Sequence, residues 1–197
     1  MKYFFCTLTF ITSLLGDRCF QGIDTARERP DLQTYYLSNS DYFMIHYDIE
    51  GNNAPNPIDS DNNNVPDYIE SIGVAADSVI YILNTVMGFK EVTQDEDGMY
   101  YIYVHKLSTG YWGITRSVDG DGYNPSYIEL RNDYSGLSDY CDNLEDLLWL
   151  TVGHEYFHAV QLEYSKLTYE PYFKEFTSMW FENIFVPNCF RFICRLQ

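Results

Sequence analysis

The feature that most constrains this chain is the segment 154–158, HEYFH, which lies in the middle of a long predicted helix. That helix runs from Leu144 to about Tyr164, with Asp142 or Asn143 as its cap. Residues four apart on a helix face the same side, so His154 and His158 can point their imidazoles at one ion. The flanks of the segment are uncharged. We therefore predict a helix-borne zinc site; the alternative is two structural histidines on one helix face.

Glu155 lies one step round the same helix, beside such an ion rather than on it. There it can take a proton from a water molecule whose pKa the zinc lowers toward ~7. We therefore predict Glu155 as the catalytic general base and acid.

A catalytic zinc site needs a third protein ligand, and no further histidine follows His158. Glu175 lies in the first turns of a second predicted helix, 171–185, which could pack back against the first. We predict Glu175 as the third zinc ligand. Glu182 is either that ligand or a group that orients one of the two histidines from the side away from the metal. The other acidic candidates are Glu163, which points away on the first helix, and Glu170, in the loop before Pro171.

Residues 151–160 and 172–182 together resemble the gluzincin branch of the zincin metallopeptidases. The segment 172–178, YFKEFTS, is similar to that branch's aromatic-x-x-Glu-Gly-x-Ala ligand helix, with Phe176 replacing Gly and Ser178 replacing Ala. The motif order over residues 42–185 is also similar to a group of secreted bacterial metalloproteases of unknown substrate. The resemblance implies a zincin-like fold: a twisted N-terminal sheet lobe packed on the active-site helix, and a C-terminal helical lobe across a cleft. Only fifteen residues follow Glu182, so we expect that second lobe to be short and truncated.

The rest of the chain predicts an α+β domain over residues 42–197, after a surface lead-in at 19–41. Strand patterns cover 42–49, 99–107, 111–115 and 126–130, and a helical pattern covers 67–88 with Gly88 as its stop. Residues 126–133 are expected to form the edge of the sheet, where an extended peptide could add as a strand.

A loop at 59–70, DSDNNNVPDYIE, has oxygen-bearing residues at the spacing of an EF-hand or dockerin-like calcium loop. Asn64 replaces the usual glycine at position 6, where asparagine tolerates the left-handed conformation. The alternative is an Asn/Asp-rich turn that caps the following helix. The predicted ligands of this structural calcium are Asp59, Asp61, Asn63, Val65 through its carbonyl, Asp67 and Glu70. Residues 119–122, DGDG, look similar but are predicted to form a turn.

The N-terminus predicts export. Lys2 is followed by thirteen uncharged residues up to Leu15, before Gly16 and Asp17; this is the length of a signal-peptide apolar region and too short to span a bilayer. We predict a signal peptide over residues 1–18, against the alternative of a buried N-terminal strand, and expect no membrane span elsewhere. Outside the signal, Cys19, Cys141, Cys189 and Cys194 allow one or two disulfides whose pairing stays open.

The net charge of −17 argues against nucleic acid and anionic lipid as partners, but is compatible with bound metal cations. The expected function is therefore a secreted zinc endopeptidase acting on peptides or proteins. The alternative is a calcium-stabilised extracellular binding or structural module with a catalytically inactive zinc site. The oligomeric state stays open.

Overall fold

The computed structural model of the chain describes residues 28–118, 123–135, 141–165, 170–187 and 189. It is an α+β fold with one five-stranded sheet in the order β1-β2-β3-β5-β4. The strands are β1 (Thr34–Leu37), β2 (Phe43–Tyr47), β3 (Tyr100–His105), β4 (Gly113–Ser117) and β5 (Ser126–Arg131). β2, β3 and β5 run parallel, and β1 and β4 pair antiparallel at the two edges. The α+β prediction is confirmed.

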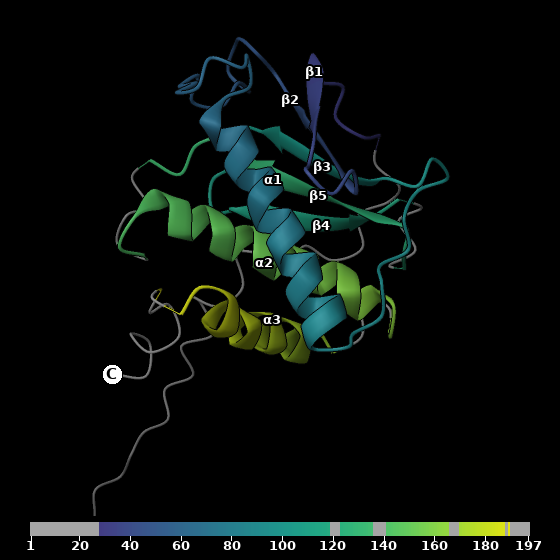
Figure 1. The fold of residues 1–197 in the computed structure, drawn as a ribbon. Coiled ribbons are helices and arrows are strands. Elements are labelled where there is room, and N and C mark those ends of the chain that lie inside the picture. The colour runs from purple at the N-terminus through teal and green to yellow at the C-terminus, as the bar shows by residue number, and fades with distance from the viewer. Residues whose placement is uncertain (1–27, 119–122, 136–140, 166–169, 188, 190–197) are drawn as a thin grey trace, which may run out of the picture.

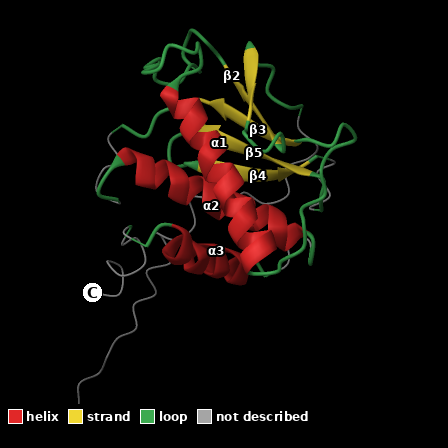
Figure 2. Cartoon of the chain, in the orientation of Figure 1, coloured by secondary structure: helices red, strands yellow, loops and turns green. Residues whose placement is uncertain are grey.

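Three helices complete the described fold: α1 (Asp67–Ile80), α2 (Leu144–Leu162) and α3 (Pro171–Phe185). α1 continues into a π-helical segment, η1 (Tyr81–Val86), and Gly88 follows with a φ of 75°. Figures 1 and 2 show α1 and α2 packed on the sheet, with α3 beyond α2. The long helix therefore lies between the sheet and α3, which gives it buried contacts on opposite sides.

The core follows from the alternation of side chains along the strands. In β2 the buried residues are Phe43, Ile45 and Tyr47, and in β3 Ile102 and Val104 are fully buried. α1 contributes Ile69, Ile72, Ala76 and Val79 at helical spacing to the same core. α2 differs from an ordinary surface helix because nearly every residue from Leu147 to Leu162 is buried. Its apolar residues accordingly occur around the whole helix rather than on one stripe.

Two expectations about the sheet are wrong. The edge next to the long helix is β4, and β5 lies inside the sheet between β3 and β4. Five of the six residues of β5 are buried, as is typical of an interior strand flanked on both sides. The predicted surface lead-in 19–41 also contains a strand that was not expected, because Thr34–Leu37 pairs with β2 as β1. β1 is short and lacks a clear alternation of buried and exposed residues, so its pattern was weak.

Among the described helices, one is long and apolar enough to cross a membrane, although the sequence analysis expected none. This is the continuous helix Asp67–Val86, with a mean hydropathy of 1.3 in its most apolar window. A core helix of a soluble protein passes the same test, so one such helix is weak evidence. In this fold its residues Ile69, Ile72 and Val79 are fully buried in the core.

A disulfide joins Cys141, just before α2, to Cys189, just after α3. It ties together the two ends of the α2–α3 pair across a sequence separation of 48 residues. The predicted signal peptide, Cys19, Cys194 and the predicted turn 119–122 lie outside the described residues.

Candidate metal centre

Three side chains from α2 and α3 converge on one point. His154 Nε2 lies 3.1 Å from His158 Nε2 and 3.4 Å from a carboxylate oxygen of Glu175. The second Glu175 oxygen lies 3.2 Å from His158 Nε2. Ligands about 2.0–2.1 Å from a tetrahedral zinc are roughly 3.3–3.4 Å apart, so this spacing fits one ion. Within the described part of the chain, no other group of three His, Cys, Asp or Glu ligand atoms lies so close together.

Local sequence explains why α2 and α3 meet here. Asn143 caps α2 by accepting a hydrogen bond from the Asp146 N–H at 2.8 Å. Pro171 starts α3, where its fixed φ suits the first helical position. At Gly153 an added Cβ would lie 2.6 Å from the Phe185 ring, so the glycine lets α3 approach α2 beside His154. Phe157 and Phe181 stack between the helices with ring centroids 5.2 Å apart.

The outer nitrogen of each histidine is held by an acceptor. His154 Nδ1 lies 2.6 Å from Glu182 Oε1, and His158 Nδ1 lies 2.9 Å from Gln161 Oε1. The Gln161 amide is oriented by its own donor, because its Nε2 donates to the Lys174 carbonyl at 2.9 Å. With each Nδ1 donating to its acceptor, Nε2 is the ring nitrogen left to face Glu175 and the other imidazole.

Glu155 is fully buried and lies under the edge strand β4. Its Oε2 accepts a hydrogen bond from Thr115 Oγ1 at 2.9 Å, whereas its Oε1 is buried with no hydrogen-bond partner. One oxygen of Glu175 is likewise buried without a hydrogen bond. Buried carboxylate oxygens that lack donors are costly unless a cation or a reaction partner faces them.

Two neighbouring side chains of α3 have shifted pKa values. Burial raises the pKa of Glu175, but its contacts with His154 and His158 outweigh burial and hold that pKa well below its usual range. Next to it, burial lowers the pKa of Lys174 to about 8. Lys174 Nζ donates to the Ser165 carbonyl at 2.9 Å. Two imidazoles and the carboxylate of Glu175 thus meet at one point, with Glu182 behind His154, and this is a donor set that suits zinc.

The structure brings together the three predicted zinc ligands, His154, His158 and Glu175, with Glu182 behind His154. Glu155 follows His154 on α2 and packs against β4. Glu163 points elsewhere, as expected, and accepts hydrogen bonds from the Thr93 N–H and the Asn124 amide. Glu170 is exposed at the start of α3. These two residues are therefore not part of the cluster.

Sequence reasoning missed three residues of the centre: Gln161, Thr115 and Gly113. Gln161 could have been found, since it lies three residues after His158 and shares its helix face. Thr115 and Gly113 carried no signal, because they reach Glu155 only through the packing of β4 on α2.

The predicted calcium loop folds around Asp59 and Asn63. Asp59 accepts hydrogen bonds from the backbone N–H groups of Asn63 and Asn64, and Asn64 has a φ of 70°, as position 6 requires. The Asn63 amide donates to Asp61 at 3.1 Å and to Glu70 at 2.7 Å, so these side chains already meet. Asp67 is turned to Ser60 instead, with which it forms two hydrogen bonds. Val65 donates its N–H to Asn63 Oδ1.

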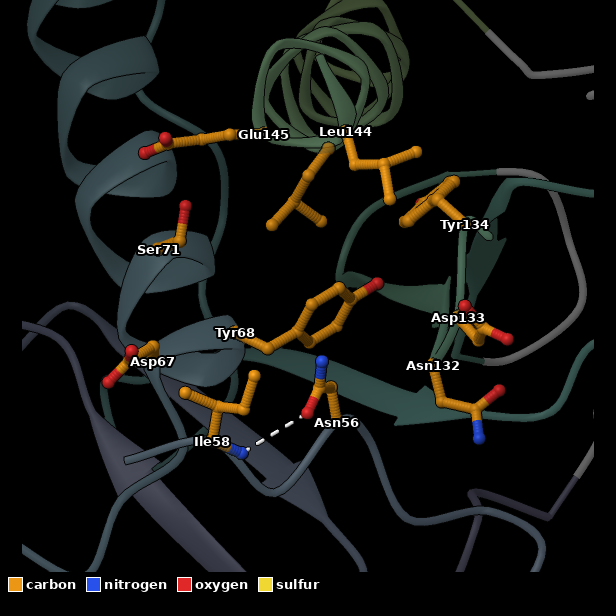
Figure 3. A pocket seen from close by; sticks show the side chains of 11 residues that line it. Asn56, Ile58, Asp67, Tyr68, Ser71, Asn132, Asp133, Tyr134, Leu144 and Glu145 are labelled. Carbon is orange, nitrogen blue, oxygen red and sulfur yellow. Dashed lines mark hydrogen bonds between the residues drawn. The ribbon is translucent and has the colours of Figure 1, made fainter. Parts of the chain in front are cut away.

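A separate cavity of about 480 Å³ lies between the starts of α1 and α2 (Figure 3). Its walls include Tyr68, Leu144 and Leu148. Two nearby carboxylates are already hydrogen-bonded, Asp67 to Ser60 and Asp133 to Ser135. None of the candidate zinc ligands lines this cavity.

Comparisons with protein families, with curated proteins and with solved structures found no match to this chain.

Proposed function

We propose that the chain is a zinc-dependent endopeptidase in which His154, His158 and Glu175 hold the ion. The observation that carries this proposal is the pair of facing Nε2 atoms, 3.1 Å apart, with both Nδ1 atoms already committed as donors. Two lone pairs at that distance repel. A proton could bridge two of the three ligand atoms, but a metal ion satisfies both nitrogens and Glu175 together.

Bound zinc supplies Lewis acidity, which lowers the pKa of water and polarises a peptide carbonyl. Glu155 takes the proton from the attacking water and later gives it to the leaving amine. Its burial supports this role, because bulk solvent then screens the charge of the carboxylate little. Glu182 and Gln161 keep the imidazoles in the orientation and tautomer that the ion requires.

The outer edge of β4 supports a peptide as substrate. Trp112 accepts a hydrogen bond from the Arg131 N–H, so alternate residues from 112 onward pair with β5. Gly113 and Thr115 therefore direct their backbone groups to the other side, where no described strand pairs with β4. An extended peptide could add there, next to Glu155. This replaces residues 126–133 as the expected docking edge.

We also propose that the protein is exported and that the 59–70 loop takes a structural calcium ion. The Cys141–Cys189 disulfide supports an oxidising compartment. The meeting of Asp61, Asn63 and Glu70, with Asp59 binding the loop backbone, supports the calcium ion. Extracellular calcium is abundant enough to fill a weak site of this kind.

The test is digestion of a mixed peptide library by the purified chain with zinc and calcium, beside Glu155→Gln. The parent should cleave, and the variant should bind one zinc without cleaving. Glu163→Gln is the control, because Glu163 lies outside the cluster and should leave cleavage intact. Stoichiometric zinc with no cleavage by the parent would contradict a peptidase and favour a binding module with an inactive zinc site.

A further inference from the structure

We infer that the edge strand β4 positions the general base: Thr115 holds Oε2 of Glu155, and Gly113 leaves the room that Oε1 needs. This inference rests on the proposed function and goes further, because it assigns different roles to the two oxygens of one carboxylate. Oε2 is the anchored oxygen, and Oε1 is the one that exchanges the proton with water.

The first observation is the Thr115 hydroxyl. It lies 2.9 Å from Glu155 Oε2 and 2.7 Å from the Glu155 backbone carbonyl oxygen. Neither oxygen can donate while the carboxylate is ionised, so the single hydroxyl proton is shared between them. Thr115 is 6% exposed and Glu155 is 0% exposed, so water competes little for this hydrogen bond. A hydrogen bond to a buried carboxylate is one of the stronger kinds in proteins.

The second observation is steric. A Cβ on Gly113 would lie 2.6 Å from Glu155 Cγ and 3.0 Å from Oε1. It would also lie 3.0 Å from Thr151 Cγ2, so the backbone of β4 and the packed helix leave it no space. Gly113 and Thr115 are two residues apart and so face the same side of the strand. One face of β4 therefore supplies both the space beside Gly113 and the hydroxyl donor of Thr115.

The third observation is the inequality of the two oxygens. Oε2 accepts a hydrogen bond from the Thr115 hydroxyl, whereas Oε1 is buried and has no hydrogen-bond partner. A buried acceptor without a hydrogen bond destabilises the fold. A catalytic role of the group is one physical reason why a protein keeps such an acceptor.

The test compares Thr115→Val, which keeps the shape, with Thr115→Ser, which keeps the hydroxyl. In the zinc-loaded protein, Thr115→Val should lower kcat for a cleaved library peptide by roughly 10- to 100-fold, since small misplacements of catalytic groups cost this much. KM and zinc content should stay near parental values, and Thr115→Ser should recover most of kcat. A crystal structure of zinc-loaded Thr115→Val should show the Glu155 carboxylate rotated away from its parental position.

Thr151→Val is the matched control, because it also removes a buried threonine hydroxyl, one that donates to the Leu147 carbonyl at 2.9 Å. It should leave kcat within a few-fold of the parent. Parental kcat in Thr115→Val, or an unmoved carboxylate in its crystal structure, would overturn the inference. An inactive parent would instead overturn the proposed function, and the crystal structure would still decide the positioning role.

Discussion

Glu182 Oε1 lies 2.6 Å from His154 Nδ1, and both side chains are almost completely buried. A carboxylate behind a metal-binding histidine fixes the ring and makes its inner nitrogen a better ligand. Glu182→Gln keeps the shape but replaces the charged acceptor with a neutral amide. We expect zinc affinity to fall roughly 10- to 100-fold, measured by competition with a chelator of known affinity.

The control for this prediction is Glu175→Gln, which changes a direct ligand instead. That variant should lose more affinity than Glu182→Gln, because a neutral amide replaces a charged ligand at the ion. Equal zinc affinity in Glu182→Gln and the parent would mean that Glu182 has only a structural role between α2 and α3.

The residues of α2 and α3 that form the centre could be predicted because their signals are local. His154 and His158 share a face through helix geometry alone, and Pro171 marks where the next helix starts. Glu175 and Glu182 then follow on that helix, seven residues apart and so on the same side. The centre could be assembled from sequence because it needs only these two neighbouring helices.

Features that depend on the order of strands could not be predicted in this way. Whether β4 or β5 forms the edge depends on which strand pairs with β3, and both strands are short and mostly buried. The contact of Thr115 with Glu155 spans 40 residues and exists only once that order is set. The disulfide pairing could not be predicted for the same reason, since Cys141 and Cys189 meet only after α3 packs on α2.

The Cys141–Cys189 disulfide should stabilise the helix pair that carries the centre. It joins the start of α2 to the end of α3, so it limits how far the two helices separate in the unfolded chain. Replacing both cysteines by serine should lower the free energy of unfolding by about 2–5 kcal/mol, measured by urea denaturation. A reducing agent should destabilise the parent similarly and leave the double variant unchanged. If the reducing agent acts equally on both proteins, this disulfide is not the source of the stability.

Glu129 should make the fold sensitive to acid. It is buried on β5, 2.6 Å from Arg116 Nε and 3.2 Å from His105 Nε2. Burial raises its pKa, but the hydrogen bond to His105 and the charge of Arg116 outweigh burial, so the pKa of Glu129 is lowered. A carboxylate with a lowered pKa stabilises the fold above its unfolded value of about 4.3, and that stability is lost as the pH falls through the folded pKa.

Glu129→Gln should therefore be less stable than the parent at pH 7 and lose less further stability below about pH 4.3. The measurement is the free energy of unfolding between pH 7 and pH 3. Glu50→Gln is the control, because Glu50 is exposed and should leave the pH profile as it is in the parent. Parallel profiles for Glu129→Gln and the parent would show that ionisation of Glu129 does not contribute.

Calcium should stabilise the chain through the 59–70 loop. Asn63 Nδ2 lies between Asp61 and Glu70, and an amide flip would turn its oxygen toward a cation held by those carboxylates. With a dissociation constant of about 1 mM, 10 mM calcium adds about 1.4 kcal/mol of stability. That should raise the melting temperature by a few degrees, and equal magnesium at the same ionic strength should do less because it demands a tighter, octahedral site. Glu70→Gln should remove the calcium effect, whereas Glu50→Gln, an exposed carboxylate outside the loop, should keep it. The same shift with both ions in the parent, or a persistent calcium effect in Glu70→Gln, would leave the loop as a turn that caps α1.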